Sequence, residues 1–493
     1  MRDYNPEDFI IRYPGIYDER EQQALDKWWA EANAINTRKS LDVDALISGN
    51  LPENTPGIGP VLKVTEAMIK YNHAKYESEN PLFNDKKYAI NAGYKDIPAY
   101  MTFGCHDDSY TCAFPPEARD TLLVSQASHW AESYQDVYAG DTLYLTIDER
   151  QMVDLTPKEG SVYRSLALYN GGTIYNQRGE VVNKVGFHYV ESVKTYKPGR
   201  KPDNYEAMGF MGFWEDPDWF KKEDHLYTDE DYEYMKSIWA NESLRGDEPR
   251  YWEDVNIGDK LTPTLEGPII ECALPSVPYG HGIGGTRTMR KEILDDSIRK
   301  TMIKDGHGIL RLTDPKAYTP QVPDGVRAAF MVDDGRGEAL NNSLDEEKVL
   351  DRPEGMDVDT ADIHTAEGDM RAAIINYYGR DLATHCLNNW MGDRGRLFSI
   401  KWSIMPPETH AAYGKPVPES PYYVHWIEQA PGMENCHVSC HGLSRDTALV
   451  EAVVSDKYVK NGKYLVKVIW WISDINKEIW INGCAEVELP HRK

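Results

Sequence analysis

The sequence has few basic residues for its length. It contains 54 Lys and Arg against 80 Asp and Glu, so its formal net charge at pH 7 is −26. A surface that binds nucleic acid or an anionic membrane needs a basic face, so this balance argues against both kinds of partner. An anionic small molecule could still bind, but only in a local pocket lined by basic side chains.

Long apolar runs are also missing. The densest one, Val468–Ile472, is far shorter than the ~20 residues that span a bilayer. Residues 1–15 are charged and have no apolar centre, so they do not resemble a signal peptide. Cysteine is scarce too: seven residues scattered along the chain indicate a reducing compartment and no disulfide framework. We therefore expect a soluble, cytoplasmic protein.

The sequence does have enough apolar residues to build hydrophobic cores. Hydrophobic residues make up 41% of the chain, which excludes a largely disordered protein. At about 100–200 residues per domain, a chain of 493 residues suggests two or three domains. Tyr (31) and Trp (13) outnumber Phe (10), and such residues often line pockets with an apolar body and a polar tip.

The order of the expected elements repeats along the chain. Helical spacing predicts helices over 18–38, 62–76 and 229–240, one that begins near 98, and one over 380–391. Alternation between turn residues predicts strands over 141–147, 162–169, 181–189, 447–459, 463–472 and 478–489. Each half thus places a helix before antiparallel hairpins. This pattern predicts an α+β protein built from two similar units in tandem.

Changes in composition suggest where these units begin and end. We assign residues 1–60 to an N-terminal helical extension and 61–196 to the first unit. Residues 197–248 are acidic and aromatic and contain prolines, which is typical of a linker. The second unit is assigned to 249–493, with a long polar insertion at about 285–355.

Short blocks in both halves resemble the MaoC-like dehydratases, which include enoyl-CoA hydratases. They are Glu79–Asp85, Ile97-Pro98-Ala99, Tyr175–Val182, Arg245–Asp259, Leu387–Gly395 and Gly483–Arg492. The resemblance covers roughly residues 70–190 and 245–493. It implies two tandem hot-dog domains, each an antiparallel sheet wrapped around one long helix. Two hot dogs of that family pair, with the active site at their contact, and here one chain would supply both in an intrachain double hot dog.

The first half departs from the motif that the resemblance implies. Family hydratases carry the motif Asp-x-Asn-Pro-x-His. Adding or removing water across the α,β bond of an acyl thioester needs a carboxylate and an imidazole that act on the same water molecule. Here Ser78 and Phe83 stand at the acid and imidazole positions, and neither transfers protons at neutral pH. This half is therefore expected to be degenerate and to shape the substrate tunnel, with Phe83 as a substrate-binding residue. Glu79 is an alternative proton-transfer group.

The second half keeps the spacing of the acid and the imidazole. Asp359 and His364 are five residues apart, as in the motif, although Asn-Pro is missing between them. Gly379 follows at the expected start of a helix, where a backbone N–H can stabilise the thioester oxygen as it gains charge. The resemblance implies His364 as general base or acid, Asp359 as its carboxylate and Gly379 as the oxyanion donor. The segment is acidic, so Asp362 and Asp369 remain alternatives for the carboxylate.

Further residues are candidates for substrate binding. The glycine-rich segment Gly280–Gly285 satisfies GxGxxG, but prolines rather than a strand precede it, so we expect a loop of the substrate channel. His281 in this loop is the second candidate for the catalytic imidazole. A cluster of basic residues follows and could clamp the phosphates of coenzyme A. The expected substrate-binding residues are Phe83, His281, Arg287, Arg290, Lys291 and Tyr378.

These observations favour one function and leave two alternatives. We expect an enoyl-CoA hydratase or 3-hydroxyacyl-CoA dehydratase whose partner is an acyl-CoA thioester, with no cofactor and no metal. The resemblance also implies a homo-oligomer, a dimer or higher. An acyl-CoA thioesterase on the same fold would use the same helix start, and a non-catalytic acyl-CoA-binding protein would fit if both halves had lost their chemistry.

Overall fold

The computed structural model describes ten stretches of the chain. They are residues 19–74, 79–104, 122–154, 163–194, 222–269, 290–313, 376–403, 425–440, 442–443 and 445–492.

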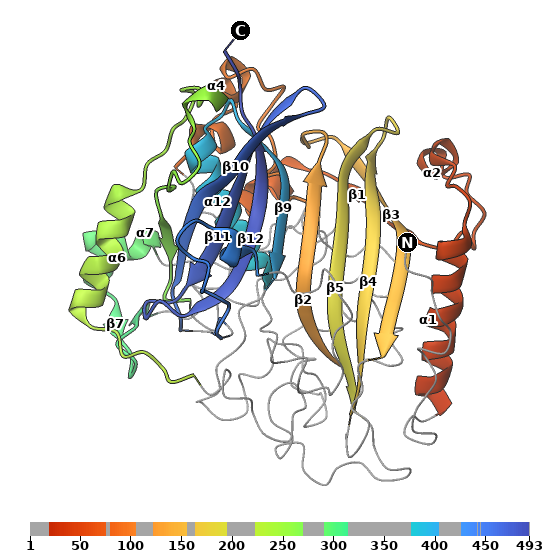
Figure 1. Cartoon of the computed structure of the whole chain (residues 1–493), viewed down its shortest axis with the longest axis horizontal. Coiled ribbons are helices and arrows are strands. Elements are labelled where there is room, and N and C mark those ends of the chain that lie inside the picture. The colour runs from red at the N-terminus through yellow and green to blue at the C-terminus, as the bar shows by residue number, and fades with distance from the viewer. Residues whose placement is uncertain are drawn as a thin grey trace.

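One antiparallel sheet runs through both halves of the chain, with the order β1-β3-β4-β5-β2-β9-β12-β11-β10-β6 (Figure 1). The first half contributes β1 (Ile58–Lys63), β2 (Leu122–Ser133), β3 (Thr142–Asp154), β4 (Tyr163–Asn176) and β5 (Val181–Lys194). The second half contributes β6 (Thr264–Glu266), β9 (Arg396–Ser403), β10 (Ala448–Lys460), β11 (Lys463–Ser473) and β12 (Ile479–Glu488). A separate small hairpin consists of β7 (Ile303–Lys304) and β8 (Leu310–Arg311).

Both halves arrange their strands in the same order. From its outer edge inward, the first half reads β1-β3-β4-β5-β2 and the second reads β6-β10-β11-β12-β9. The halves join through the equivalent strands β2 and β9, which pair antiparallel with Ala131 opposite Ile400. Antiparallel pairing of equivalent strands is the arrangement that a twofold axis through this seam produces. The predicted tandem of two α+β hot-dog units is therefore confirmed.

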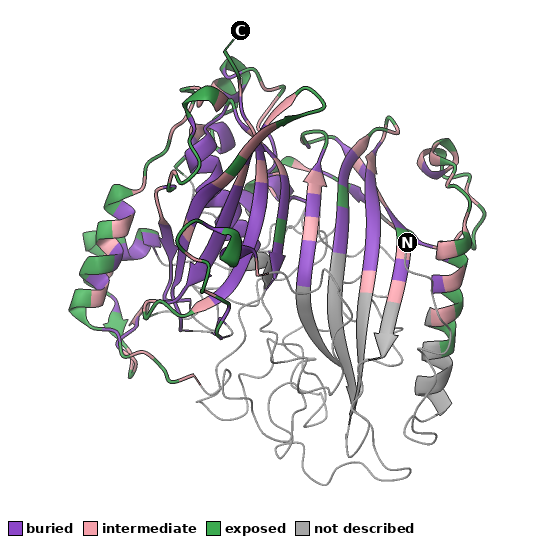
Figure 2. Cartoon of the chain, in the orientation of Figure 1, coloured by how far each residue is buried: buried purple, intermediate pink, exposed green. Residues whose placement is uncertain are grey.

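The second half wraps its sheet around one helix, α12 (Asn376–Met391). Ala383 and Leu387 of this helix share one buried core with Trp402 and Trp470 of the sheet. The same core contains Ala131 of the first half, so the two halves are not separate globules. In Figure 2 almost the whole visible helix is buried. In the first half, residues 105–121, which lead directly into β2, lie outside the described part of the chain.

The described part of the first half also contains helices outside the sheet. They are α1 (Glu19–Thr37), α2 (Val43–Ser48), α3 (Glu66–Ala74), η2 (Pro81–Phe83) and α4 (Lys86–Asn91). Helix α1 lies beside the outer strands (Figure 1). Buried Arg150 of β3 donates to Glu31 of α1 at 3.0 Å, and Asn36 makes two hydrogen bonds with the Arg150 backbone. The N-terminal extension is thus anchored to the sheet by polar contacts.

Residues 222–269 and 290–313 cover the other side of the second half. They form α6 (Asp229–Asn241), η6 (Trp252–Asp254), α7 (Arg290–Leu294) and α8 (Asp296–Arg299). The indole of Trp239 donates to the Leu265 carbonyl oxygen at 2.7 Å, and the Tyr227 hydroxyl donates to that of Arg445 at 2.7 Å. The sequence suggests a linker over residues 197–248. The described part of this segment, 222–248, therefore packs as part of the second half. A further short helix, η11 (Trp426–Gln429), packs on β11 and β12.

Most of the predicted elements are confirmed. The helices expected over 18–38, 229–240 and 380–391 are α1, α6 and α12. The helix expected over 62–76 begins only at Glu66, because the preceding residues pair with β3 as strand β1. Residues 98–104 are not helical and end in a turn, where Gly104 has a φ of 69° that a right-handed helix cannot continue. Within the described residues, no helix is long and apolar enough to cross a membrane.

Candidate functional site

The structure describes only part of the site that the sequence predicts. Four of the expected residues lie outside the described part of the chain: His281, Arg287, Asp359 and His364. The others lie in three elements, with Phe83 in η2, Arg290 and Lys291 in α7, and Tyr378 and Gly379 near the start of α12. The side chain of Tyr378 is not described.

Gly379 brings the start of α12 very close to the sheet. A Cβ at this position would lie 2.8 Å from Cδ1 of Ile481 and 3.2 Å from Cζ3 of Trp480. Both distances are shorter than an ordinary contact, so the lack of a side chain at Gly379 is what lets the helix approach β12. The proposed oxyanion role of its N–H is separate from this packing.

The next residues of α12 form a buried polar group at the seam between the halves. Nε of fully buried Arg380 donates to Oδ1 of Asp381 at 2.9 Å, and the same oxygen accepts a hydrogen bond from Thr102 at 3.2 Å. The Arg380 guanidinium also lies over the ring of Trp402, which stacks on His129 of β2. Because Thr102 and His129 belong to the first half, this turn of α12 contacts both halves.

Phe83 is buried where the family motif would place an imidazole. Its ring stacks on Tyr100 with centroids 4.2 Å apart, and the edge of His73 packs against both rings. The Asn80 side chain caps η2 by accepting from the Leu82 N–H at 2.9 Å, which fixes the backbone that carries Phe83. The apolar stack makes this position a wall and not a proton-transfer site.

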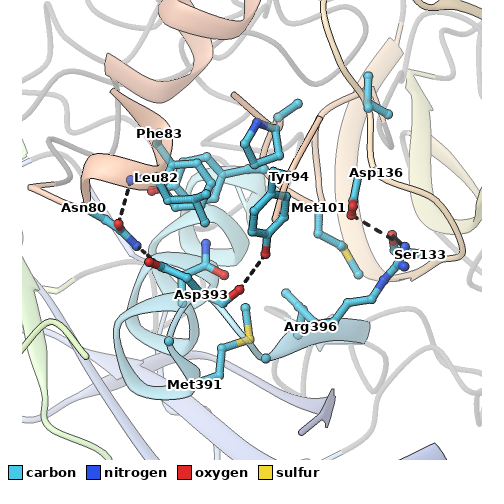
Figure 3. A pocket seen from close by; sticks show the side chains of 18 of the residues that line it. Asn80, Leu82, Phe83, Tyr94, Met101, Ser133, Asp136, Met391, Asp393 and Arg396 are labelled. Atoms are coloured by element: carbon cyan, nitrogen blue, oxygen red, sulfur yellow. Dashed lines mark hydrogen bonds and ion pairs between the residues drawn. The ribbon is translucent and has the colours of Figure 1, made fainter. Parts of the chain in front are cut away.

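Asp393, just after α12, holds the two halves together (Figure 3). Its carboxylate accepts from Nδ2 of Asn80 at 2.8 Å and from the Tyr88 hydroxyl at 2.7 Å, and its backbone oxygen accepts from the Tyr94 hydroxyl at 2.8 Å. Burial and the neighbouring carboxylate raise the pKa of Tyr88 to about 12, so this hydroxyl remains a donor at neutral pH. Asp393 thus lies at the contact of the halves, and side chains of the first half are the donors.

A pocket opens between Phe83 and the end of α12, and we call it the seam pocket (Figure 3). Its cavity volume is about 60 Å³. Its walls are apolar where Leu82, Phe83 and Met101 of the first half face Met391 and Leu397 of the second.

The polar part of the seam pocket contains both hydrogen-bond donors and acceptors. Arg396 donates from Nη2 to Oγ of Ser133 at 3.1 Å and lies 3.8 Å from Oδ1 of Asp136. Asn388 of α12 and Gln135 add neutral amides to the lining. The lining therefore contains two carboxylates, those of Asp136 and Asp393, and one guanidinium, that of Arg396.

A second buried polar cluster joins α12 to α6 and α7. Glu242, just after α6, accepts hydrogen bonds from His385 and Asn389 of α12, and it forms an ion pair with Arg290 of α7. Burial alone would raise the pKa of Glu242, but His385 and Arg290 outweigh burial and hold the pKa below its ordinary value. Arg290 therefore points inward, whereas Lys291 beside it is exposed.

Two buried thiols are poor nucleophiles, and the described residues form no metal centre. Burial raises the pKa of both Cys386 and Cys440 to about 12, so each thiol stays protonated and is a poor nucleophile at neutral pH. No group of three or more His, Cys, Asp or Glu side chains among the described residues is placed to hold a metal ion.

The sequence did not identify the polar residues of α12 as a group. Arg380, Asp381, His385 and Asn388 are all buried in the structure. A helix that is expected in the core and carries polar side chains on several faces could have identified this group, because buried polar groups need specific partners. That signal indicates that partners exist, but it does not name Thr102 or Glu242.

Comparisons with known proteins reveal similarity at the level of fold. A putative MaoC domain dehydratase from Chloroflexus aurantiacus is 11% identical, with 89% of this chain and 95% of that chain covered and a TM-score of 0.40. A double hot-dog protein from Mycobacterium tuberculosis is 8% identical, with coverages of 87% and 93% and a TM-score of 0.39. A putative oleoyl thioesterase from Lactobacillus plantarum is 7% identical, with coverages of 89% and 99% and a TM-score of 0.27.

The chain is similar in fold to MaoC-like dehydratases. No family model matches the sequence, and no curated protein matches it. The similar structures include dehydratases and thioesterases, and the fold itself is established here by the repeated strand order. Any assignment of an activity must therefore come from the residues of this chain.

Proposed function

We propose that this chain is a hydro-lyase that adds or removes water across the α,β bond of an acyl-CoA thioester, as an enoyl-CoA hydratase or a 3-hydroxyacyl-CoA dehydratase. The observation that carries the proposal is the buried polar turn at the start of α12, where Arg380 and Asp381 meet Thr102 at the seam of the two halves. Helix α12 begins at Asn376, one turn before this group, and the first N–H groups of a helix have no partner within it.

The proposed chemistry uses the segment that precedes α12. His364, oriented by Asp359, takes a proton from water, whose oxygen bonds to the β carbon of the enoyl group. The π electrons move toward the thioester oxygen, and the Gly379 N–H stabilises the negative charge that develops there. Protonation of the α carbon then completes hydration, and the reverse sequence is dehydration.

The two halves have different roles in the proposed reaction. Phe83 occupies the position of the imidazole in the first half, and its ring, stacked on Tyr100, cannot itself transfer a proton. The proposed chemistry is thus confined to the second half, while the first half supplies walls and the contacts that fix α12.

Replacement of His364 or Asp359 by Ala tests this proposal. Each change should lower kcat for hydration of an accepted enoyl-CoA by about 10²–10³-fold, which is the size expected for loss of a proton-transfer group. Because both groups serve one proton path, the double variant should lose less than the sum of the two effects. His437→Ala, a change at an exposed His, is the matched control and should leave the rate unaltered.

The outcomes separate the alternatives. A near-wild-type rate in His364→Ala would move the base to His281 or Glu79. Release of free thiol from a saturated acyl-CoA would identify a thioesterase instead. A wild-type protein that is inert toward every acyl-CoA tested would contradict the proposed reaction and favour an acyl-binding protein.

A further inference from the structure

A side chain of the first half reaches the turn of α12 that contains Gly379. The Thr102 hydroxyl donates a hydrogen bond to Oδ1 of Asp381 at 3.2 Å, across 279 residues of sequence. Thr102 and Asp381 are only 1% and 2% exposed. Asp381 follows Gly379 by two positions and thus lies within the same helical turn of about 3.6 residues. A contact that holds the Asp381 side chain therefore also holds the backbone of Gly379 relative to the first half.

The ion pair between Arg380 and Asp381 does not by itself align α12 with the first half. Nε of Arg380 donates to Oδ1 of Asp381 at 2.9 Å, and Nη2 lies 2.7 Å from the same oxygen. Because these two residues are adjacent on one helix, their ion pair moves with the helix. The hydrogen bond from Thr102 crosses the seam, so it ties this turn to the other half.

The segment that carries Thr102 is anchored in the first half. The Ala99 N–H donates to the Val137 carbonyl oxygen at 2.9 Å, and the Phe103 N–H donates to that of Tyr100 at 2.8 Å. The Phe103 side chain is fully buried. Thr102 therefore presents its hydroxyl from a fixed position.

The same turn of α12 packs against the sheet of the second half. A Cβ at Gly379 would lie 2.8 Å from Cδ1 of Ile481, so this packing sets how closely the helix approaches β12. Close packing fixes a distance, whereas a hydrogen bond also has a preferred direction. The contact with Thr102 can thus set the orientation of the turn.

We propose that Thr102 is a positioning residue for the hydration reaction, which by holding Asp381 sets the direction of the Gly379 N–H toward the thioester oxygen. The inference rests on the proposed function. It gives the first half a part in the reaction although the Phe83 ring cannot transfer a proton. Because the Gly379 N–H stabilises charge that develops only in the transition state, misalignment should lower kcat and leave KM almost unchanged.

Two substitutions at Thr102 separate its hydroxyl from its packing. Thr102→Val keeps the shape and loses the donor, whereas Thr102→Ser keeps the donor and loses a methyl group. A misplacement of about 1 Å can cost about 10²-fold in rate, and loss of one orienting hydrogen bond should cost less, about tenfold in kcat for Thr102→Val. Thr102→Ser should recover most of this rate, and a role in packing alone predicts the reverse order.

Hydration of an enoyl-CoA is measured for each variant and divided by the folded fraction from circular dichroism, so that loss of folded protein is not counted as loss of rate. Thr37→Val is the matched control, because the exposed Thr37 hydroxyl donates only within α1. Its rate should equal that of the wild type. Thr102→Ala, which also lacks the hydroxyl, replaces the Val variant if that variant does not fold.

Amide hydrogen exchange over residues 376–382 of the same proteins, without substrate, lets the two proposals fail separately. Thr102→Val should speed this exchange about tenfold and Thr102→Ser should not. An inert wild type with this hydroxyl-dependent protection would overturn the proposed reaction and keep Thr102 as a positioning residue of α12. An active wild type whose kcat is unchanged in Thr102→Val, or falls equally in the Val and Ser variants, would overturn the role of Thr102 and keep the reaction.

Discussion

Loss of the Glu242 carboxylate should destabilise the protein more than loss of any exposed carboxylate. Glu242 accepts hydrogen bonds from Nε2 of His385 at 2.8 Å, from Nδ2 of Asn389 at 2.8 Å and from Nη1 of Arg290 at 2.6 Å. The side chains of Glu242 and Arg290 are only 10% and 11% exposed. This carboxylate therefore joins α6, α7 and α12 from inside the second half.

The expected loss in the free energy of unfolding follows from the groups that Glu242→Ala leaves buried without a partner. Glu242→Ala buries the Arg290 guanidinium without its ion-pair partner, and removal of one partner of a buried pair costs about 3–5 kcal/mol. Hydrogen bonds to a charged group are worth about 1.5–3 kcal/mol each, so three of them counted singly would sum to about 4.5–9 kcal/mol, mostly above that range. Water that enters the vacated space recovers part of the loss, and we therefore expect a decrease of about 3–5 kcal/mol in the free energy of unfolding.

Urea denaturation followed by circular dichroism measures this change. Glu233→Ala is the matched control, because Glu233 is 72% exposed in its pair with Lys236 and should contribute far less. Glu242→Leu combined with Arg290→Met removes both charges and should recover most of the stability. If Glu242→Ala cost no more than the control, the cluster would be solvated and the reasoning from burial would be wrong.

The cluster around Glu242 also predicts how the free energy of unfolding depends on pH. The pKa of Glu242 is held below its ordinary 4.5 in the folded state, since His385 and Arg290 outweigh the effect of burial. A carboxyl whose pKa is lower when folded contributes its full stabilisation above the unfolded value, and loses it as the pH falls through the folded value. The decline in stability below about pH 4.5 should therefore be shallower in the double variant than in the wild type.

Three further changes test individual features. Phe83→Ala should cost about 3–5 kcal/mol through loss of its stack on Tyr100, and should alter chain-length preference more than kcat in assays with a series of enoyl-CoAs. Gly379→Ala should cost about 1–3 kcal/mol in urea denaturation, because its Cβ would meet Ile481 at 2.8 Å, and an unchanged midpoint would show that the helix can shift. Lys291→Ala should raise KM for an acyl-CoA with little change in kcat if this exposed side chain meets the phosphates, and an unchanged KM would place them elsewhere.

The sequence by itself determined the architecture of the sheet's hairpins. The tight turn at 177–179 between two strand-forming segments predicts a hairpin, and β4 and β5 pair antiparallel around this turn. The same holds for β10, β11 and β12, and the repetition of this pattern predicted two units. Strands β2 and β9 were missed, because pairing across the seam depends on the other half of the chain and leaves no local signal.

Only the tertiary structure decided what surrounds α12. Helical spacing tells which side chains share a face, but it does not tell what lies against that face. Asp381 meets Thr102, His385 meets Glu242 and Asp393 meets Asn80, and these partners are 279, 143 and 313 residues apart in the chain. Each polar group on the helix needs a partner once it is buried, and folding of the whole chain supplies it from a different segment. The site at the seam thus depends on contacts between distant segments, which no local pattern in the sequence encodes.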